Sequence, residues 1–347
     1  MPRIRIREKI WETHDACSFY FETMEGNTLF FKPGQFITLH FQLNGLDFRR
    51  SYSLCTVPIK DKYPGITVKR VTDGLASNHL LDALHIGDIL EYDYPAGLFY
   101  PEISIQNKGT YFFIGAGSGI TPLYAMLQTI LHKENHSQIV LLYSNRDEAS
   151  IIYKSRLDQL GFEHAERLSI VHLLSSPQEG WTGFNERLNP ALLKDLIREL
   201  QGEEHVHFFL CGPKGFMHMA EETILEMGYA PAQIKKESFE IRAHSTPHRE
   251  QIAQMGRKTA KILYGPKEYV IEIEEDQTIL EAALKNGIRL PYSCQNGVCT
   301  ACMGTCLEGE VDVSEADALT EGEKKKGYML TCVGKPISEH IVIQIEA

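Results

Sequence analysis

The 347-residue sequence has no arginine- or lysine-rich stripe and no long apolar run. Lysine and arginine together number 35 against 46 aspartates and glutamates, which gives a net charge of −11. Because nucleic-acid phosphates require a basic surface, we exclude a nucleic-acid-binding protein. No stretch of about 18 apolar residues is present, so we expect no membrane-spanning helix. The amino terminus lacks the apolar core of a secretion signal, which predicts a cytoplasmic protein.

Disulfide bonds are not expected in the cytoplasm, so the eight cysteines need another explanation. Five of them lie in the last quarter of the chain. In a reducing compartment, such a density indicates metal binding rather than cross-links. The five residues are Cys294, Cys299, Cys302, Cys306 and Cys332.

Secondary-structure patterns divide the chain into three domains. Over residues 1–105, short β-like runs alternate with glycine and proline turns, which predicts a small antiparallel β-barrel. Over residues 106–240, strands alternate with helices of ten or more residues, as in a doubly wound parallel α/β sheet. The polar segment 241–258 is interpreted as a linker, and residues 259–347 as a third domain.

The expected elements follow from the same patterns. In the first domain we expect strands at the amino terminus and at 36–41, 51–56, 66–71 and 89–94. In the second we expect strands at 111–114, 138–143, 169–173 and 207–210, and helices at 121–131, 151–160, 190–200 and 215–226. In the third we expect strands at 259–264 and 269–273 and a helix at 278–286.

The strongest motif is a cysteine spacing in the third domain. Cys294, Cys299, Cys302 and Cys332 follow the pattern C-x4-C-x2-C…C, the plant-type spacing of a [2Fe–2S] cluster. A zinc ribbon needs two matching C-x2-C knuckles, which are missing. Gly297 stands where the backbone must come close, so that amide groups can point at the cluster sulfurs. We therefore interpret these four cysteines as cluster ligands.

The segment 291–302 resembles the cluster loop of plant-type ferredoxins, and the resemblance implies an α+β β-grasp fold for residues 259–347. Gln295 departs from the arginine that many relatives carry, which affects partner contacts rather than ligation. Cys306 falls outside the spacing and is interpreted as a small buried apolar residue, with a role as an alternative ligand left open.

A second motif lies on a strand of the first domain. Arg50 can pair with a pyrophosphate, Tyr52 can stack on an isoalloxazine ring, and Ser53 can hydrogen-bond a flavin nitrogen. The same residues also suit an ordinary strand with alternating solvated and buried side chains. Gly74 begins a turn into a helix, where backbone amides and the Ser77 hydroxyl could hold phosphate.

The second domain carries two strand–turn–helix transitions. In the first, Gly115, Gly117 and Thr121 lie in a glycine-rich turn whose order is not G-x-G-x-x-G, so it is either a variant phosphate loop or a plain tight turn. In the second, Cys211 and Gly212 follow a strand, at the carboxyl end where open α/β sheets bind ligands. Both transitions favour a nucleotide site.

The strand at 139–143 ends next to Arg146, where the adenosine ribose is expected. An arginine there can pair with a 2′-phosphate and favours NADPH, whereas a carboxylate would favour NADH. Asp147 and Glu148 follow at once, and Arg146 can equally be a solvated surface residue. The preference for NADPH over NADH is therefore slight.

Together these motifs resemble the ferredoxin–NADP reductase superfamily, in the order flavin barrel, nicotinamide domain and C-terminal ferredoxin. The sequence looks most like the reductase components of multicomponent oxygenases, such as those of phenylacetyl-CoA epoxidase and steroid hydroxylases. The resemblance implies an NAD(P)H-dependent oxidoreductase with FAD and a [2Fe–2S] cluster that passes electrons to a partner oxygenase. It implies that Arg50, Tyr52, Ser53 and Ser77 hold FAD, and that Gly115, Gly117, Thr121, Cys211 and Gly212 bind the nucleotide, with Cys211 beside its ring.

The segment Glu237-Ser238-Phe239 resembles the ending of the plant reductases, where the aromatic residue covers the flavin. Here the chain continues, so a covering role for Phe239 is left open. The resemblance makes Ser53, Cys211 and Glu237 the candidate catalytic residues.

Hydride transfer delivers two electrons together, whereas a [2Fe–2S] cluster accepts one, and FAD is the converter between them. A diaphorase with another acceptor, or a redox sensor without turnover, remain alternatives. Residues 258–347 contain nine basic and fifteen acidic residues. That acidity suits either docking on a basic partner or a simple solvated surface.

Overall fold

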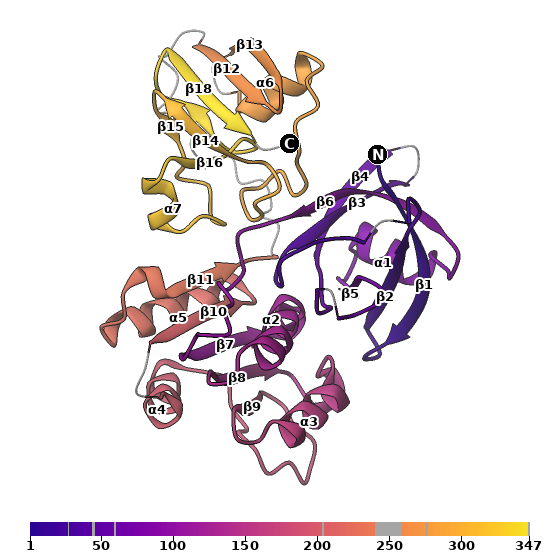
Figure 1. Cartoon of the computed structure of the whole chain (residues 1–347), viewed down its shortest axis with the longest axis vertical. Helices are drawn as coiled ribbons and strands as arrows, with labels where there is room; N and C mark the ends of the chain where they lie inside the picture. Colours follow the sequence, from indigo (N-terminus) through magenta and orange to yellow (C-terminus); the bar gives the residue numbers. More distant parts are fainter. Residues whose placement is uncertain are drawn as a thin grey trace. The chain divides into compact units, whose positions relative to one another are not determined.

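A computed structural model describes residues 1–26, 28–43, 46–58, 60–202, 205–239, 258–274 and 277–345 (Figure 1). The chain forms two compact units, Met1–Glu237 and Ser238–Ala347. The predicted linker lies outside the described residues, apart from its last residue, Lys258, which begins a strand. The predicted domain boundaries at 105 and 240 stay predictions.

The first part of the first unit is an antiparallel sheet of six strands in the order β4-β3-β6-β1-β2-β5. A bridge between Leu54 and Ile66 joins the two edges, so that the sheet closes on itself. One helix, α1 (Leu75–Asp82), packs Leu80 and Leu81 into the apolar core of this barrel. The strands are β1 (Arg3–Trp11), β2 (Ala16–Thr23), β3 (Phe36–Leu43), β4 (Leu46–Ser53), β5 (Gly65–Lys69) and β6 (Ile89–Ala96).

Two details of the barrel differ from the sequence-based expectation. The strand expected at 51–56 ends at Ser53. The expectation also missed β2, because five of its eight residues are buried and the strand shows no alternation of apolar and polar residues.

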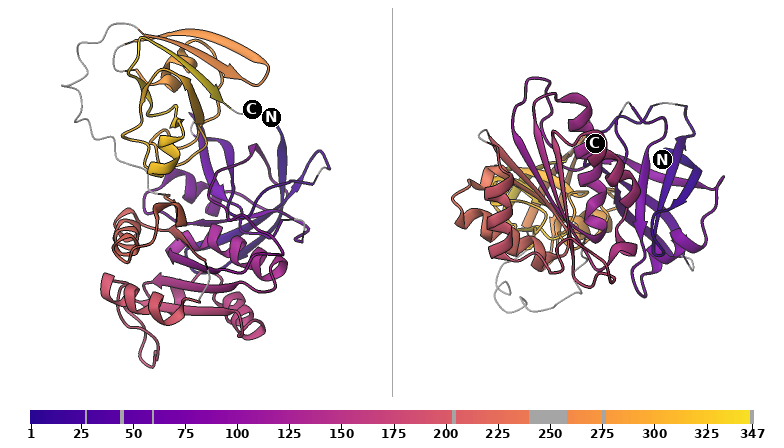
Figure 2. Two further views of the ribbon diagram at one scale, coloured as in Figure 1. Left: turned by 60° about the vertical axis from the view of Figure 1, so that its left-hand side comes forward. Right: turned by 90° about the horizontal axis from the view of Figure 1, so that it is seen from below.

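The second part of the first unit is a parallel sheet in the order β11-β10-β7-β8-β9, which confirms the doubly wound α/β fold. Two pairs of helices cover its two faces: α2 and α3 pack on one apolar core and α4 and α5 on the other (Figure 2). The strands are β7 (Thr110–Ala116), β8 (Gln138–Asn145), β9 (Leu168–Leu174), β10 (Val206–Cys211) and β11 (Ile234–Glu237). The helices are α2 (Ile120–Lys133), α3 (Lys154–Glu163), α4 (Pro190–Leu200) and α5 (Lys214–Glu226).

The helix expected at 151–160 begins at Lys154. Asp147 caps a short 3-10 turn at Glu148–Ser150, and Tyr153 then adopts a left-handed φ of 64°. A helix cannot run through such a residue, so α3 starts one residue later.

The second unit is a mixed sheet in the order β13-β12-β18-β14-β16, in which β12 and β18 are parallel and the other pairs antiparallel. Helix α6 (Ile279–Lys285) packs on the same core and begins at a capping box of Thr278 and Glu281. The strands are β12 (Lys258–Tyr264), β13 (Lys267–Ile273), β14 (Met303–Glu308), β16 (Tyr328–Leu330) and β18 (His340–Ile345). The remaining elements are β15 (Val311–Asp312), β17 (Lys335–Pro336) and α7 (Glu321–Lys325). This is the α+β arrangement expected of the ferredoxin domain.

Within the part of the chain that the structure describes, every helix is too short or too polar to cross a membrane.

Candidate active site and cluster site

The three candidate catalytic residues lie together in the first unit. Ser53 ends β4 and Glu237 ends β11, and the Ser53 Oγ donates a hydrogen bond to Oε2 of Glu237 at 3.3 Å. Cys211 ends the neighbouring strand β10, directly opposite Glu237 in the parallel ladder. Strand ends from the barrel and from the parallel sheet thus bring a hydroxyl, a thiol and a carboxyl group to one place.

Burial controls the ionisation of this group. It raises the pKa of Glu237 to about 8, partly offset by the hydrogen bond from Ser53. It also raises the pKa of Cys211 well above its usual value, and the nearby Glu237 charge adds to the effect. Cys211 is therefore a neutral thiol and no activated nucleophile. The site suits a reaction in which the side chains orient reactants, as in hydride transfer, rather than form a covalent bond.

The predicted flavin residues lie on β4 and at the start of α1. The Arg50 guanidinium donates to the Arg49 carbonyl at 2.7 Å and lies over the Phe48 ring. Tyr52 packs against the barrel core, and burial raises the pKa of its phenol. Arg50 and Tyr52 thus alternate with Ser53 along the strand and face the other side of it.

The Ser77 hydroxyl was predicted to hold phosphate, but in the structure it forms hydrogen bonds within its own turn. It accepts a hydrogen bond from the Val71 amide at 3.1 Å and donates to the Gly74 carbonyl at 3.3 Å. The side chain is buried and holds the turn together. Gly74 caps α1, and no side chain hydrogen-bonds the first amide groups of the helix.

The glycine turn after β7 is packed closely against β10. Gly117 has a positive φ of 54°, and a Cβ atom on Gly119 would lie 2.1 Å from the Cys211 carbonyl oxygen. The Thr121 hydroxyl donates to the Ser118 carbonyl at 3.0 Å and holds the turn rather than facing outward. Sequence reasoning missed Gly119, whose need for glycine arises from a contact across the sheet.

The other glycines of this region have related reasons. A Cβ on Gly115 would lie 2.8 Å from Leu123 Cδ1, and one on Gly212 would lie 3.1 Å from the Ala116 Cβ. Sequence reasoning also missed Lys69 of β5, whose Nζ would lie 3.9 Å from a Cβ on Gly117. This places a barrel cation, which also lies 3.7 Å from a carboxylate oxygen of Asp15, beside the glycine turn.

A cavity of about 430 Å³ opens at the carboxyl ends of the parallel strands. Ser144 and Asn145 at the end of β8 line it, and their buried side-chain oxygen and nitrogen atoms have no hydrogen-bond partner among the described residues. Buried polar atoms without partners need a ligand or an ordered water to complete their hydrogen bonds. Arg187 also lines the cavity, whereas the predicted Arg146 is exposed beside it.

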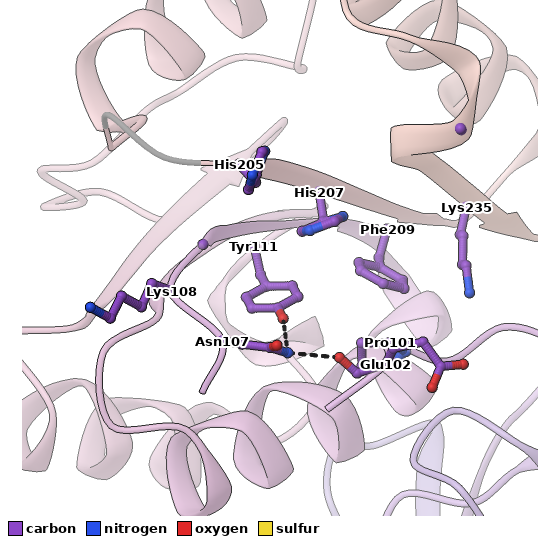
Figure 3. A pocket seen from close by; sticks show the side chains of 11 residues that line it. Pro101, Glu102, Asn107, Lys108, Tyr111, His205, His207, Phe209 and Lys235 are labelled. Carbon is purple, nitrogen blue, oxygen red and sulfur yellow. Dashed lines mark hydrogen bonds between the residues drawn. The ribbon is translucent and has the colours of Figure 1, made fainter. Parts of the chain in front are cut away.

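A second cavity of about 370 Å³ lies near the amino ends of β7 and β10 (Figure 3). The rings of Tyr111, His207 and Phe209 line it, with Lys235 at one side. None of the predicted site residues lies there.

The four predicted cluster ligands come together in the second unit. The Sγ atoms of Cys294 and Cys299 are 3.1 Å apart, and the Cys332 thiol hydrogen-bonds both Cys294 and Cys302. Hydrogen bonds among the four sulfurs lower the pKa of Cys294 and Cys302 and raise that of Cys299 and Cys332, because the accepting sulfurs are stabilised as thiolates by the donating thiols. Among the described residues no three suitable side chains are arranged to hold a single metal ion. The four cysteines supply the four sulfurs that a plant-type two-iron cluster needs.

The backbone of the cluster loop has the expected geometry, with an amide group directed at a sulfur and a close approach at Gly297. The Asn296 amide points at the Cys294 sulfur at 3.4 Å. Gly297 has a φ of 72°, and a Cβ there would lie 2.2 Å from the Glu315 carbonyl oxygen. The interpretation of Cys306 as buried is wrong: it is half-buried on β14, and its thiol donates to the Glu308 carbonyl at 3.3 Å.

Phe239 is exposed and lies in the second unit, so its covering role stays open.

Three protein-family models match the chain. An oxidoreductase FAD-binding domain matches residues 3–100, an oxidoreductase NAD-binding domain residues 113–222, and a 2Fe-2S iron-sulfur cluster binding domain residues 263–336. The ferredoxin reductase component of 3-ketosteroid-9-alpha-monooxygenase from Rhodococcus rhodochrous is 32% identical over 96% of this chain and 93% of that protein. The chain belongs to the reductase components of oxygenase systems.

Two further comparisons agree with this assignment. One component of the 1,2-phenylacetyl-CoA epoxidase of Escherichia coli K12 is 29% identical to this reductase over 97% of the chain and 95% of the relative. The structure of phthalate dioxygenase reductase shares its fold, with a TM-score of 0.60 at 23% identity over 99% of this chain and 97% of that one. The reductase is thus an NAD(P)H-dependent oxidoreductase, and the predicted FAD, nicotinamide nucleotide and [2Fe–2S] cluster are confirmed as its cofactors.

Proposed function

We propose that this reductase passes electrons from NAD(P)H through FAD and the [2Fe–2S] cluster to a partner oxygenase. The observation that carries the proposal is the meeting of Ser53, Cys211 and Glu237 between the barrel and the parallel sheet. When bound, the flavin accepts a hydride and releases its two electrons one at a time.

The residues of the chain position the reactants. Ser53 would orient the flavin with its hydroxyl, and the neutral Cys211 thiol would lie beside the nicotinamide ring. Glu237 holds its proton at a buried carboxyl oxygen and accepts from Ser53. In this proposal Arg50, Tyr52, Gly74 and the turn braced by Ser77 hold FAD, and Gly115, Gly117, Thr121, Arg146, Cys211 and Gly212 form or flank the nucleotide site.

A Ser53→Ala variant tests the proposal. We expect anaerobic flavin reduction by NAD(P)H to slow on the order of 10²-fold, because the flavin is no longer oriented, while FAD content stays unchanged. Stopped-flow absorbance measures both quantities. Ser51→Ala is the matched control, since Ser51 lies on the same strand and bonds Thr38 instead. An unchanged rate in Ser53→Ala contradicts the role of Ser53.

The nucleotide is proposed to be NADPH. Arg187 lines the cavity next to Ser144 and Asn145, Arg146 follows directly, and no carboxylate among the described residues lines it. We expect Arg187→Gln to lower the ratio of kcat/KM for NADPH over NADH about tenfold, because a charge-assisted hydrogen bond to the 2′-phosphate is lost. Arg198→Gln, on the exposed side of α4, is the control. An unchanged ratio contradicts the role of Arg187 as the partner of the 2′-phosphate.

The acceptor is proposed to be the oxygenase that accompanies this reductase, of the phenylacetyl-CoA epoxidase kind or another multicomponent type. The relatives named above support this, since each serves an oxygenase. A salt dependence of partner reduction would support electrostatic docking by the acidic ferredoxin domain. A cytoplasmic location is proposed because none of the eight cysteines, all of which lie within the described residues, forms a disulfide bond.

A further inference from the structure

A buried polar network joins the barrel to the parallel sheet of the first unit, away from Ser53. Its centre is Arg156 on α3. The Arg156 Nη1 donates to the Tyr20 hydroxyl on β2 at 2.8 Å, and Nη2 lies 3.0 Å from Oε1 of Glu12, which follows β1. The Glu12 side chain is only 7% exposed. A carboxylate buried to that extent needs its cation, because an unpaired buried charge is costly.

The network continues as a directed chain of hydroxyl groups. Glu12 accepts a hydrogen bond from the Ser18 hydroxyl at 2.6 Å, and Ser18 bonds the Thr67 hydroxyl at 2.6 Å. Thr67 in turn bonds the Tyr153 hydroxyl. Because the carboxylate can only accept, each hydroxyl donates toward Glu12 and the Tyr153 phenol is the last donor. Burial raises the pKa of Tyr153 well above its usual value, so that it keeps the proton it donates.

Tyr153 adopts an unfavourable backbone conformation at this position. It lies directly before α3 with a left-handed φ of 64°, which a bulky residue takes only where the surroundings enforce it. Its ring stacks on Tyr124 of α2 with centroids 4.3 Å apart. The strained residue thus connects the barrel hydroxyls with α2, the helix that begins at the glycine turn.

The network and the Ser53–Glu237 hydrogen bond are two separate connections between the same two parts. We propose that the interdomain clamp, formed by Glu12, Ser18, Tyr20, Thr67, Tyr153 and Arg156, positions the nicotinamide domain against the flavin barrel for hydride transfer. This inference rests on the proposed function. The clamp residues do not line the nucleotide cavity, so Arg156 is a positioning residue that acts through α2 and α3.

The test uses the FAD-loaded full chain and stopped-flow flavin reduction over a range of NADPH and NADH concentrations. We expect Arg156→Met to lower the limiting rate about tenfold, because small displacements of the reacting atoms slow hydride transfer strongly. The concentration for half-maximal rate should change less than about threefold, since the nucleotide contacts remain. Arg156→Lys, which keeps the charge and one hydrogen bond, should restore part of the rate.

Lys154→Met is the matched control. Lys154 lies on the same helix and forms an exposed ion pair with Asp158 at 2.8 Å, so its loss should leave the limiting rate unchanged. If Arg156→Met does not fold, Tyr20→Phe replaces it in the test. This variant removes the hydroxyl that accepts from Arg156 and keeps the aromatic ring. A limiting rate in the folded variants within twofold of the parent protein overturns the proposal, even where the melting temperature falls. If the parent protein is not reduced by NADPH or NADH, the proposed function itself fails.

Discussion

Glu237 carries a carboxyl group that is buried where the barrel strand β4 meets β11. Water cannot solvate its charge there, and the Ser53 hydrogen bond compensates only in part. The protonated form is therefore favoured up to a pKa of about 8, against an ordinary value of 4.5. A carboxyl group that is neutral near pH 7 can accept from Ser53 without placing a full charge beside the flavin site.

This ionisation has a consequence for stability. Between pH 4.5 and about 8 the folded protein keeps a proton that the unfolded chain has lost, so the free energy of unfolding contributed by Glu237 falls as pH rises through that window. We expect Glu237→Gln to gain melting temperature relative to the parent protein as pH rises from 5 to 8. Thermal unfolding at several pH values measures the difference. If the melting temperatures of the two proteins change in parallel with pH, the raised pKa of Glu237 is contradicted. Glu226→Gln, which changes an exposed carboxylate on α5, is the control.

The cluster loop is an element whose shape depends on one glycine. Gly297 lies against the segment that follows β15: its carbonyl accepts from the Ala318 amide at 2.9 Å, and a Cβ would meet the Glu315 carbonyl at 2.2 Å. Backbone carbonyls cannot move aside without moving their own segment. The loop therefore keeps the thiols in place only while this position lacks a side chain.

We expect Gly297→Ala to lose the [2Fe–2S] cluster, because the loop must move away from Glu315 to admit the methyl group. Iron content per chain and paramagnetic resonance after dithionite measure the loss. Gly287→Ala is the matched control: its φ is 74°, close to the 72° of Gly297, but nothing lies within 4 Å of the added Cβ. The control should lose only about 1 kcal/mol of stability and keep its iron. Full iron content in Gly297→Ala would contradict this account.

Each of the two units of the molecule has its own apolar core. The clusters around Phe113, Phe112 and Phe19 lie within residues 1–237, whereas the cluster around Ile262 and Leu330 lies within the second unit. We therefore assign hydride transfer to the first unit and single-electron transfer to the partner to the second unit, since the two units have separate cores.

A chain of residues 1–239 should bind FAD and reduce ferricyanide with NAD(P)H at the rate of the full chain, because the whole hydride site lies in the first unit. It should reduce the partner oxygenase at less than about a tenth of the full rate, because the cluster is missing. Steady-state assays with both acceptors measure this. The full chain with Cys332→Ser, which lacks a cluster ligand, is the control and should behave alike. Undiminished oxygenase reduction by either variant would rule out the cluster as the relay.

Local signals predicted the barrel, the parallel sheet and the cluster ligands, and the family resemblance of these motifs implied the ferredoxin fold and the cofactors. A cysteine spacing, a glycine turn after a strand, and strands alternating with helices all depend on neighbouring residues, so they can be read in order along the chain. The ligands Cys294, Cys299 and Cys302 lie on one loop, and only Cys332 had to come from elsewhere. The start of α3 could not be predicted from neighbouring residues. Tyr153 has a left-handed backbone conformation there, and its hydroxyl bonds the Thr67 hydroxyl of the barrel.

The arrangement of the proposed hydride site depends on the tertiary structure. Ser53 and Glu237 are 184 residues apart and meet only because a barrel strand ends beside a sheet strand. Gly119 needs to be glycine only because the Cys211 carbonyl faces it, and the Ser77 hydroxyl turns inward only because its own loop closes on it. The residue types and their spacing determine which chemical groups each segment can offer. Distances between segments come from packing, which brings together residues that no local pattern connects.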